Sequence, residues 1–129
     1  MDKYIEDMQA IQKLKETLLE LRELKKSFEH SGITLHTPSL DNHECCSPSV
    51  LECFRTMMPH LKAKNSPLHF RFSKSLKNPS IIKSVDLCKN SSQEEKKVCQ
   101  KCDSYPKKDS REFVRQLESL LQKTMTTLM

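Results

Sequence analysis

Two pairs of cysteines constrain the fold of this chain more than any other feature of its sequence. Cys46 and Cys53 are seven residues apart, about two helical turns, and Cys99 and Cys102 are three apart, about one turn. Each pair therefore lies near one face of its segment, and the two pairs suit two roughly parallel disulfide bridges, Cys46–Cys99 and Cys53–Cys102. Each bridge would stabilise the fold by about 2–4 kcal/mol, mainly by restricting the unfolded chain.

The remaining cysteines, Cys45 and Cys88, could form a third bridge. Because Cys45 is adjacent to Cys46, these two residues could exchange partners, so the sequence leaves open which of them pairs with Cys99. The even count predicts three bridges and no free thiol. Disulfides form in oxidising compartments, so the cysteines predict a secreted, extracellular protein.

Zinc binding and redox chemistry are the alternative roles for the cysteines. Cys99-x-x-Cys102 has the spacing of a zinc knuckle, and His43 lies near Cys46, but the sequence has one such knuckle only. A redox-active Cys-x-x-Cys pair belongs in a thioredoxin-like βαβ context, which the sequence does not show. We therefore expect neither a metal site nor a redox site.

The length and composition favour one helical domain, residues 1–129. The chain has one Gly and no Trp, and its net charge of +5 is too diffuse to indicate nucleic-acid binding. No apolar run reaches the roughly 18–20 residues that would insert into a membrane. The first residues are too charged for a signal peptide, so we interpret Met1 as an expression start on a mature chain. The five histidines are scattered and no phosphate-binding loop is present, so we expect no catalytic residues and no cofactor. We also expect the protein to be a monomer.

Apolar residues at spacings of three and four predict four helices, at about 3–29, 48–62, 68–87 and 110–128. The stripe predicted for the first helix consists of Tyr4, Ile5, Met8, Ile11, Leu14, Leu18, Leu21, Leu24 and Phe28. The stripe predicted for the last helix consists of Phe113, Val114, Leu117, Leu120, Leu121, Met125 and Leu128.

Proline and capping residues indicate where these helices begin, bend or end. Pro59 is expected to kink or end the second helix, and Pro79 to make the third one irregular. The alternation of Leu68, Phe70 and Phe72 is a strand period, so the third helix is the least secure of the four. Before the last helix, Asp109 followed three residues later by Glu112 predicts an N-cap with a capping box.

Residues 31–47 and 89–98 are polar and without periodicity, so both are predicted to be long connections. A long first crossover allows the second helix to run parallel to the first, as in cytokine-type bundles. The expected fold is an all-α, short-chain four-helix bundle with up-up-down-down topology, two long crossover connections and disulfide staples. Asn90-Ser91-Ser92 is a glycosylation sequon in the second connection, so Asn90 is a predicted glycosylation site.

The C-terminal region carries a resemblance to a known family. The segment Cys99–Lys108, followed by Glu112-Phe113 and by Ser119–Lys123, resembles the last helix region of interleukin-21 cytokines over about 25 residues. Cys46 and Cys53-Phe54 resemble the same branch, which includes interleukin-2 and interleukin-15. The segment Lys74–Lys77 looks like a reduced form of the basic third helix of interleukin-21.

This resemblance implies a secreted cytokine that activates JAK/STAT signalling in lymphocytes by bringing together a private receptor chain and the common gamma chain. By the same resemblance, Gln122 would be central to the common gamma chain site. The other residues implied there are Ser119, Lys123, Met125 and Thr126. The residues implied in private-receptor binding are Lys3, Glu6, Gln9, Gln12, Lys13, Arg71, Lys74 and Lys77.

The first helix departs from the interleukin-21 pattern. Its start carries Glu6 and Asp7 where interleukin-21 is basic, and its middle, Leu14–Leu21, looks more like interleukin-2. If the interleukin-2 alignment holds, Glu20 joins the private-receptor site. An interleukin-2-like T-cell growth factor therefore remains an alternative. A second alternative is a secreted helical carrier or antagonist that engages one partner only.

Overall fold

The computed structural model describes residues 2–28, 32–39, 46–86 and 99–129, with the side chains of residues 2–4 outside the description. The helices are α1 (Asp2–Lys25), α2 (Ser47–Met57), α3 (Ser66–Ser75), α4 (Pro79–Val85) and α5 (Ser110–Leu128). The strands are β1 (Thr34–His36) and β2 (Lys107–Asp109), and the 3-10 turns are η2 (Met58–His60) and η4 (Cys102–Ser104). The chain is thus mostly helical, as predicted.

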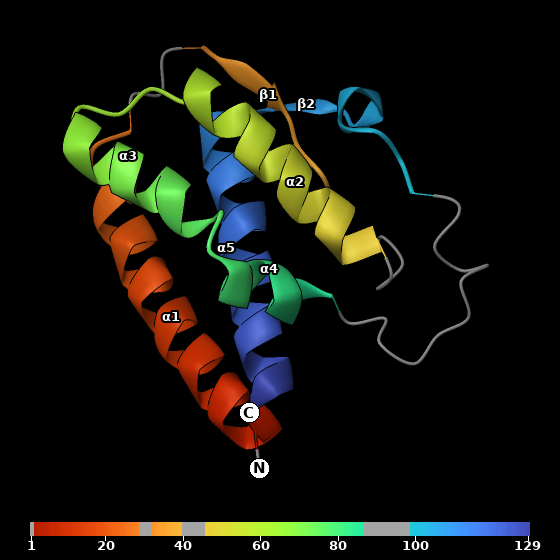
Figure 1. Ribbon diagram of the computed structural model, residues 1–129. Coiled ribbons are helices and arrows are strands. Elements are labelled where there is room, and N and C mark those ends of the chain that lie inside the picture. Colours follow the sequence, from red (N-terminus) through yellow and green to blue (C-terminus); the bar gives the residue numbers. More distant parts are fainter. Residues whose placement is uncertain (1, 29–31, 40–45, 87–98) are drawn as a thin grey trace.

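The two longest helices, α1 and α5, run in opposite directions, because α1 begins and α5 ends at the same end of the molecule (Figure 1). α1 packs against α5 and also against α3 and α4, while α2 packs against α4 and α5. The short helices α2, α3 and α4 therefore close the space beside the α1–α5 pair, and the hydrophobic core lies between them.

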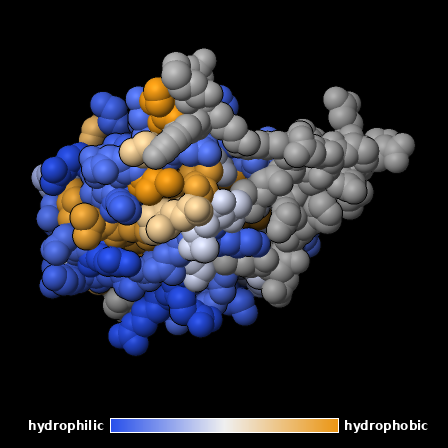
Figure 2. Space-filling view, turned by 90° about the horizontal axis from the view of Figure 1, so that it is seen from below, coloured by the Kyte–Doolittle hydropathy of each residue, from blue (hydrophilic) through white to orange (hydrophobic). Residues whose placement is uncertain are grey.

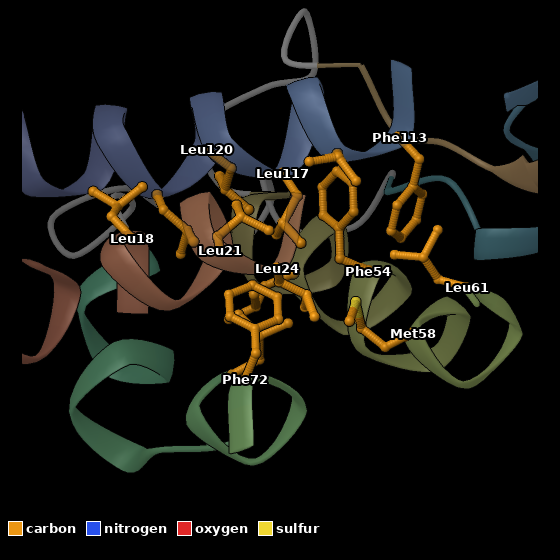
Figure 3. Packing of buried hydrophobic residues seen from close by; sticks show 14 of the residues in the cluster. Leu18, Leu21, Leu24, Phe54, Met58, Leu61, Phe72, Phe113, Leu117 and Leu120 are labelled. Atoms are coloured by element: carbon orange, nitrogen blue, oxygen red, sulfur yellow. The ribbon is translucent and has the colours of Figure 1, made fainter. Parts of the chain in front are cut away.

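The core is built from leucines of the long helices and phenylalanines of the short ones. Figure 3 shows Leu21 of α1 and Leu117 of α5 pointing toward Phe54 of α2 and Phe72 of α3. The rings of Phe54 and Phe113 meet edge to face with their centroids 5.2 Å apart. All five side chains are completely buried, and each contributes about 1.5–3 kcal/mol through its transfer from water.

α1 ends at Lys25, so the predicted end at residue 29 is wrong. Phe28 instead forms an isolated antiparallel bridge with Ala63, and the Ser27 carbonyl accepts a hydrogen bond from the Lys64 N–H at 2.8 Å. The chain leaves the helix because this tertiary pairing occupies the backbone groups that a further helical turn would use.

The predicted stripe of α1 is also wrong at its start. Ile5 and Met8 are 50% and 56% exposed, while Ala10 and Leu14 are buried. At 100° per residue, Ile5 and Met8 are turned roughly 140–160° away from Ala10, so they face solvent. From Leu14 to Leu24 the predicted leucines are buried.

The single irregular helix predicted over 68–87 is wrong, because the structure has two helices there. α3 ends at Ser75, and α4 begins at Pro79 with Asn78 as its N-cap. The Ser80 N–H donates to Asn78 Oδ1 at 2.8 Å. A residue before proline avoids helical backbone angles, so Pro79 separates the two helices and also provides the first residue of the second. Leu87 lies outside the described residues.

Pro59 and Asp109 act as predicted, as a helix end and an N-cap, but the predicted capping box and the predicted helix end at about residue 62 are wrong. α2 ends at Met57, and Pro59 lies in the 3-10 turn η2 that follows. Asp109 is the N-cap of α5, where its Oδ1 accepts the Glu112 N–H at 2.8 Å. The Glu112 carboxylate accepts hydrogen bonds from the Arg115 side chain, so it is turned along the helix rather than back to the cap.

A two-stranded antiparallel sheet, which the all-α prediction missed, joins the two long connections. β1 pairs with β2 so that Leu35 is opposite Lys108. The Thr37 N–H extends the pairing by donating to the Pro106 carbonyl at 2.9 Å. Three-residue strands have too few side chains to produce a visible period of two, which explains why the sequence did not reveal them.

Both disulfide bridges predicted from the cysteine spacing are confirmed. Cys46–Cys99 and Cys53–Cys102 have Cα–Cα distances of 5.4 and 5.0 Å, and together they attach the segment before β2 to α2. The predicted third bridge, Cys45–Cys88, and the predicted glycosylation site Asn90 lie outside the described residues.

Candidate functional site

The outer face of α5 presents the polar residues that the sequence singled out. Gln122, Lys123 and Thr126 are exposed, while Leu121 just before them and Thr124 between them are buried. α5 is thus divided into an inner apolar side and an outer polar side, and Gln122 lies on the outer side. This exposure is what its position relative to the leucine stripe predicts.

The border of the Gln122 face is partly apolar. Ser119 is half-buried, and Met125 is half-buried and packs against the core cluster. A half-buried methionine presents a flexible apolar surface beside the exposed Gln122 amide, which can both donate and accept hydrogen bonds. The arrangement can therefore combine one directional polar contact with an adaptable apolar one.

The end of the molecule where α1 begins and α5 ends has apolar surface. Figure 2, which looks at the molecule from this side, shows hydrophobic atoms gathered near the centre of the face. The exposed large apolar residues of these helix ends are Ile5, Met8 and Met129. Grooves run from Ile5 and Met8 past Gln9 toward Ser80 at the start of α4.

A second polar face lies along α1, α3 and α4. On α1, Glu6, Gln9 and Gln12 are exposed, and Lys13 is half-buried. Glu6 pairs with Lys83 of α4 at 3.4 Å, and Lys13 pairs with Glu16 at 3.8 Å. The side chain of Lys3 lies outside the description. These residues form one continuous surface beside α4, and part of its charge is already neutralised within the chain.

α3 and the turn that follows it supply the basic part of this face. Arg71, Lys74 and Lys77 are all exposed. Glu20 of α1 lies at the seam with α3, where its Oε1 accepts a hydrogen bond from the Ser75 hydroxyl at 2.8 Å. Glu20 is therefore half-buried and held by its own chain, with the basic residues of α3 beyond it.

Two exposed apolar residues of this region were not singled out from the sequence as surface residues. Leu19 on α1 is 59% exposed, and Phe70 on α3 is 69% exposed. The exposure of Leu19 could have been predicted from the sequence Leu18-Leu19, because neighbouring residues of a helix are 100° apart and Leu18 is the buried one of the two. For Phe70 the signal is its flanking by Leu68 and Phe72, which are four apart and share the buried side.

A charged cluster fixes α1 against α5 between the two faces. Glu118 of α5 pairs with Lys25 at 3.0 Å and with Arg22 at 3.7 Å, both on α1. Because Glu118 is only 16% exposed while its partners are largely in solvent, the pairs orient the two helices more than they stabilise them.

The described part of the chain gives no support to metal or redox chemistry. Within residues 2–28, 32–39, 46–86 and 99–129, no three His, Cys, Asp or Glu side chains are grouped so that they could hold a metal ion. The described cysteines Cys46, Cys53, Cys99 and Cys102 are all disulfide-bonded, so none of them is a thiolate ligand. None of the described helices is long and apolar enough to cross a membrane.

No protein-family model matches this chain, and no curated protein is significantly similar to it. Its function is therefore inferred from its residues and their geometry.

Proposed function

We propose that this chain is a secreted short-chain four-helix cytokine that crosslinks two receptor chains, in the manner of interleukin-21. The outer face of α5 around Gln122 would bind the common gamma chain, and the face formed by α1 and α3 would bind a private receptor chain. The observation that carries this proposal is the exposure of Gln122 on the outer side of α5, on the segment whose sequence resembles the family.

The topology proposed is the up-up-down-down bundle of this family, with α3 and α4 together in the place of its third helix. The opposite directions of α1 and α5 agree with this arrangement (Figure 1). The pairing of β1 with β2 also supports it, since the two long crossover connections must pass beside each other in such a bundle.

The proposed compartment is extracellular. Two disulfide bridges in one small helical chain agree with an oxidising environment. The proposed partners are cytokine receptor ectodomains, and the proposed consequence is activation of JAK/STAT signalling in lymphocytes by a monomeric ligand without enzymatic activity or cofactor.

An interleukin-2-like growth factor is the second candidate, and Glu20 is the observation that favours it. Its carboxylate lies at the α1–α3 seam with one oxygen bound to Ser75, so the other is available to a polar or basic receptor group. Co-purification with interleukin-21-type and interleukin-2-type receptor ectodomains distinguishes the two candidates, because each private chain should retain only its own ligand.

The crosslinking proposal is tested by STAT phosphorylation in lymphocytes that carry the matching receptors. The purified protein should produce a dose-dependent response. Absence of a response from such cells, together with tight binding to one ectodomain, would instead assign the chain as a carrier or antagonist.

The role of Gln122 is tested by Gln122→Asp. The variant should fold normally because the position is exposed, and it should lose signalling while private-receptor binding persists, so that it antagonises the unmodified protein. Gln100→Asp is the matched control, since Gln100 is also exposed but lies outside α5 and outside both proposed receptor faces. A folded Gln122→Asp protein of full potency would remove Gln122 from the receptor site.

A further inference from the structure

One stretch of the chain has a strongly one-sided charge. Residues 53–85 contain seven Lys and Arg residues and no Asp or Glu. They cover the end of α2 from Cys53 to Met57, all of α3 and all of α4. The whole chain has 17 Asp and Glu residues, but none of them lies in residues 53–85. The positive charges of this stretch are therefore not neutralised by acidic residues of the same stretch.

Several cations of α1 have ion pairs that most cations of this stretch lack, although Lys83 of the stretch pairs with Glu6. On α1 and just after it, Lys13, Lys25 and Lys26 each have a carboxylate partner at 3.0–3.8 Å. In the part of the chain that the structure describes, no ion pair involves any of five cations around α3. These five, called here the α3 basic track, are Lys62, Lys64, Arg71, Lys74 and Lys77, and all are exposed.

The backbone arranges the α3 basic track as an extended line. Lys62 and Lys64 flank Ala63, which forms the bridge with Phe28, so the two lysines lie on the same side of an extended segment. α3 follows at Ser66 and is ten residues long, about 15 Å. Arg71 and Lys74 are about one turn apart on its exposed side, and Lys77 follows in the turn after its end. No pocket among the described ones is lined by any of the five.

We propose that the α3 basic track binds a sulfated glycosaminoglycan, an extended polyanion of the extracellular surface. A line of exposed cations that have no ion pair among the described residues suits a linear chain of repeated anionic groups better than it suits a small anion. The two disulfide bridges agree with the proposed extracellular location, where such chains occur. The ring of Phe70, exposed on the same side of α3, adds an apolar contact for a sugar ring.

The track also overlaps the face proposed for the private receptor chain, because Arg71, Lys74 and Lys77 belong to both. Bound glycosaminoglycan therefore excludes that receptor chain, and this second statement rests on the proposed function. Lys62 and Lys64 belong to the track alone, so they separate the two binding events.

The test measures affinity for heparin over a series of NaCl concentrations, with the double variant Lys62→Glu/Lys64→Glu. Binding should weaken at least about tenfold at ~0.15 M salt, and the slope of log Kd against log salt should fall by about one unit for each cation removed. Lys15→Glu/Lys101→Glu is the charge-matched control, since it changes net charge equally at two exposed positions outside the track. This control should lose less than about threefold.

The proposal would be overturned if the unmodified protein did not bind heparin at ~0.15 M salt. It would also be overturned if the charge-matched control lost as much heparin affinity as the double variant, or if desulfated heparin bound as tightly as heparin. Tighter binding to poly-glutamate than to heparin would also overturn it, by assigning the track to an acidic protein. Lys62→Glu/Lys64→Glu should signal normally on cells that lack sulfated glycans, so failure of heparin binding and failure of the cytokine proposal are distinguishable.

Discussion

The loss in the free energy of unfolding on removal of a disulfide bridge should depend on whether the other bridge is still present. Seven residues separate Cys46 from Cys53 and three separate Cys99 from Cys102, so either bridge in the presence of the other closes a ring of only about ten residues. The loop-entropy relation gives about 2.7 kcal/mol for such a ring. The bridge that remains closes the full loop of 53 residues and is worth about 4.2 kcal/mol by the same relation.

The experiment uses a background in which Cys45 and Cys88 are alanine, so that neither can replace a lost partner. Cys53→Ala/Cys102→Ala is made first, and Cys46→Ala/Cys99→Ala is then added. Each step removes one fully buried cysteine and one half-buried one, so the cost of the lost side chains cancels in the comparison. The second step should cost about 1.5 kcal/mol more than the first.

The free energy of unfolding is measured by urea denaturation followed by circular dichroism. The same concentration of trimethylamine N-oxide is present throughout, so that the bridge-free chain remains folded. Equal costs for the two steps would refute the nested-ring reasoning, because they would mean that the unfolded chain does not respond to ring size. A first step below about 1 kcal/mol would refute it as well.

Three further predictions follow from the surface and the caps. Lys74→Glu/Lys77→Glu should slow association with the private receptor chain at low salt, because charged faces steer encounter, and an on-rate equal to that of the charge-matched control would contradict this. Asn78→Ala should cost about 1 kcal/mol in urea denaturation, since it removes the cap of α4, and an unchanged midpoint would disprove the cap. The hydrogen bond from Arg115 lowers the pKa of Glu112 below its ordinary value of 4.5, so this group stabilises the fold above that pH and the contribution is lost as pH falls through the lowered value. Glu112→Gln should therefore flatten the loss of stability below about pH 4.5, and a carboxyl NMR titration at the ordinary pKa would contradict the assignment.

The features that could be predicted are those that neighbouring residues determine. The cysteine spacing predicted both described bridges, and the helical reasoning holds for Cys46 and Cys53, at the cap and inside α2. Cys99 and Cys102 lie in an irregular segment that ends in η4, so their spacing of three is not a turn of an α-helix. Asp109 and Pro59 marked a helix start and a helix end through their own backbone chemistry. The exposure of Gln122 followed from its angle to Leu120 and Leu121 in the same helix.

The features that escaped prediction depend on distant parts of the chain. α1 ends early because Phe28 pairs with Ala63, and β1 exists because β2 is beside it. Neither pairing leaves a periodic signal in its own segment. Ile5 and Met8 have the spacing of a buried stripe, yet the helices that cover α1 lie on the side of Ala10, whose small side chain is a weak signal of burial.

The constraints on α5 are gathered at its beginning. The β1–β2 ladder, the Asp109 cap and both disulfide bridges all precede or include its first turn, while its last two turns are retained by side-chain packing. Amide hydrogens should therefore exchange more rapidly toward Leu128 than near Phe113, as in a rod clamped at one end. Gln122 lies in the freer half, so a receptor that closes on it would restrict motion there, and part of the binding signal would appear as unfavourable entropy.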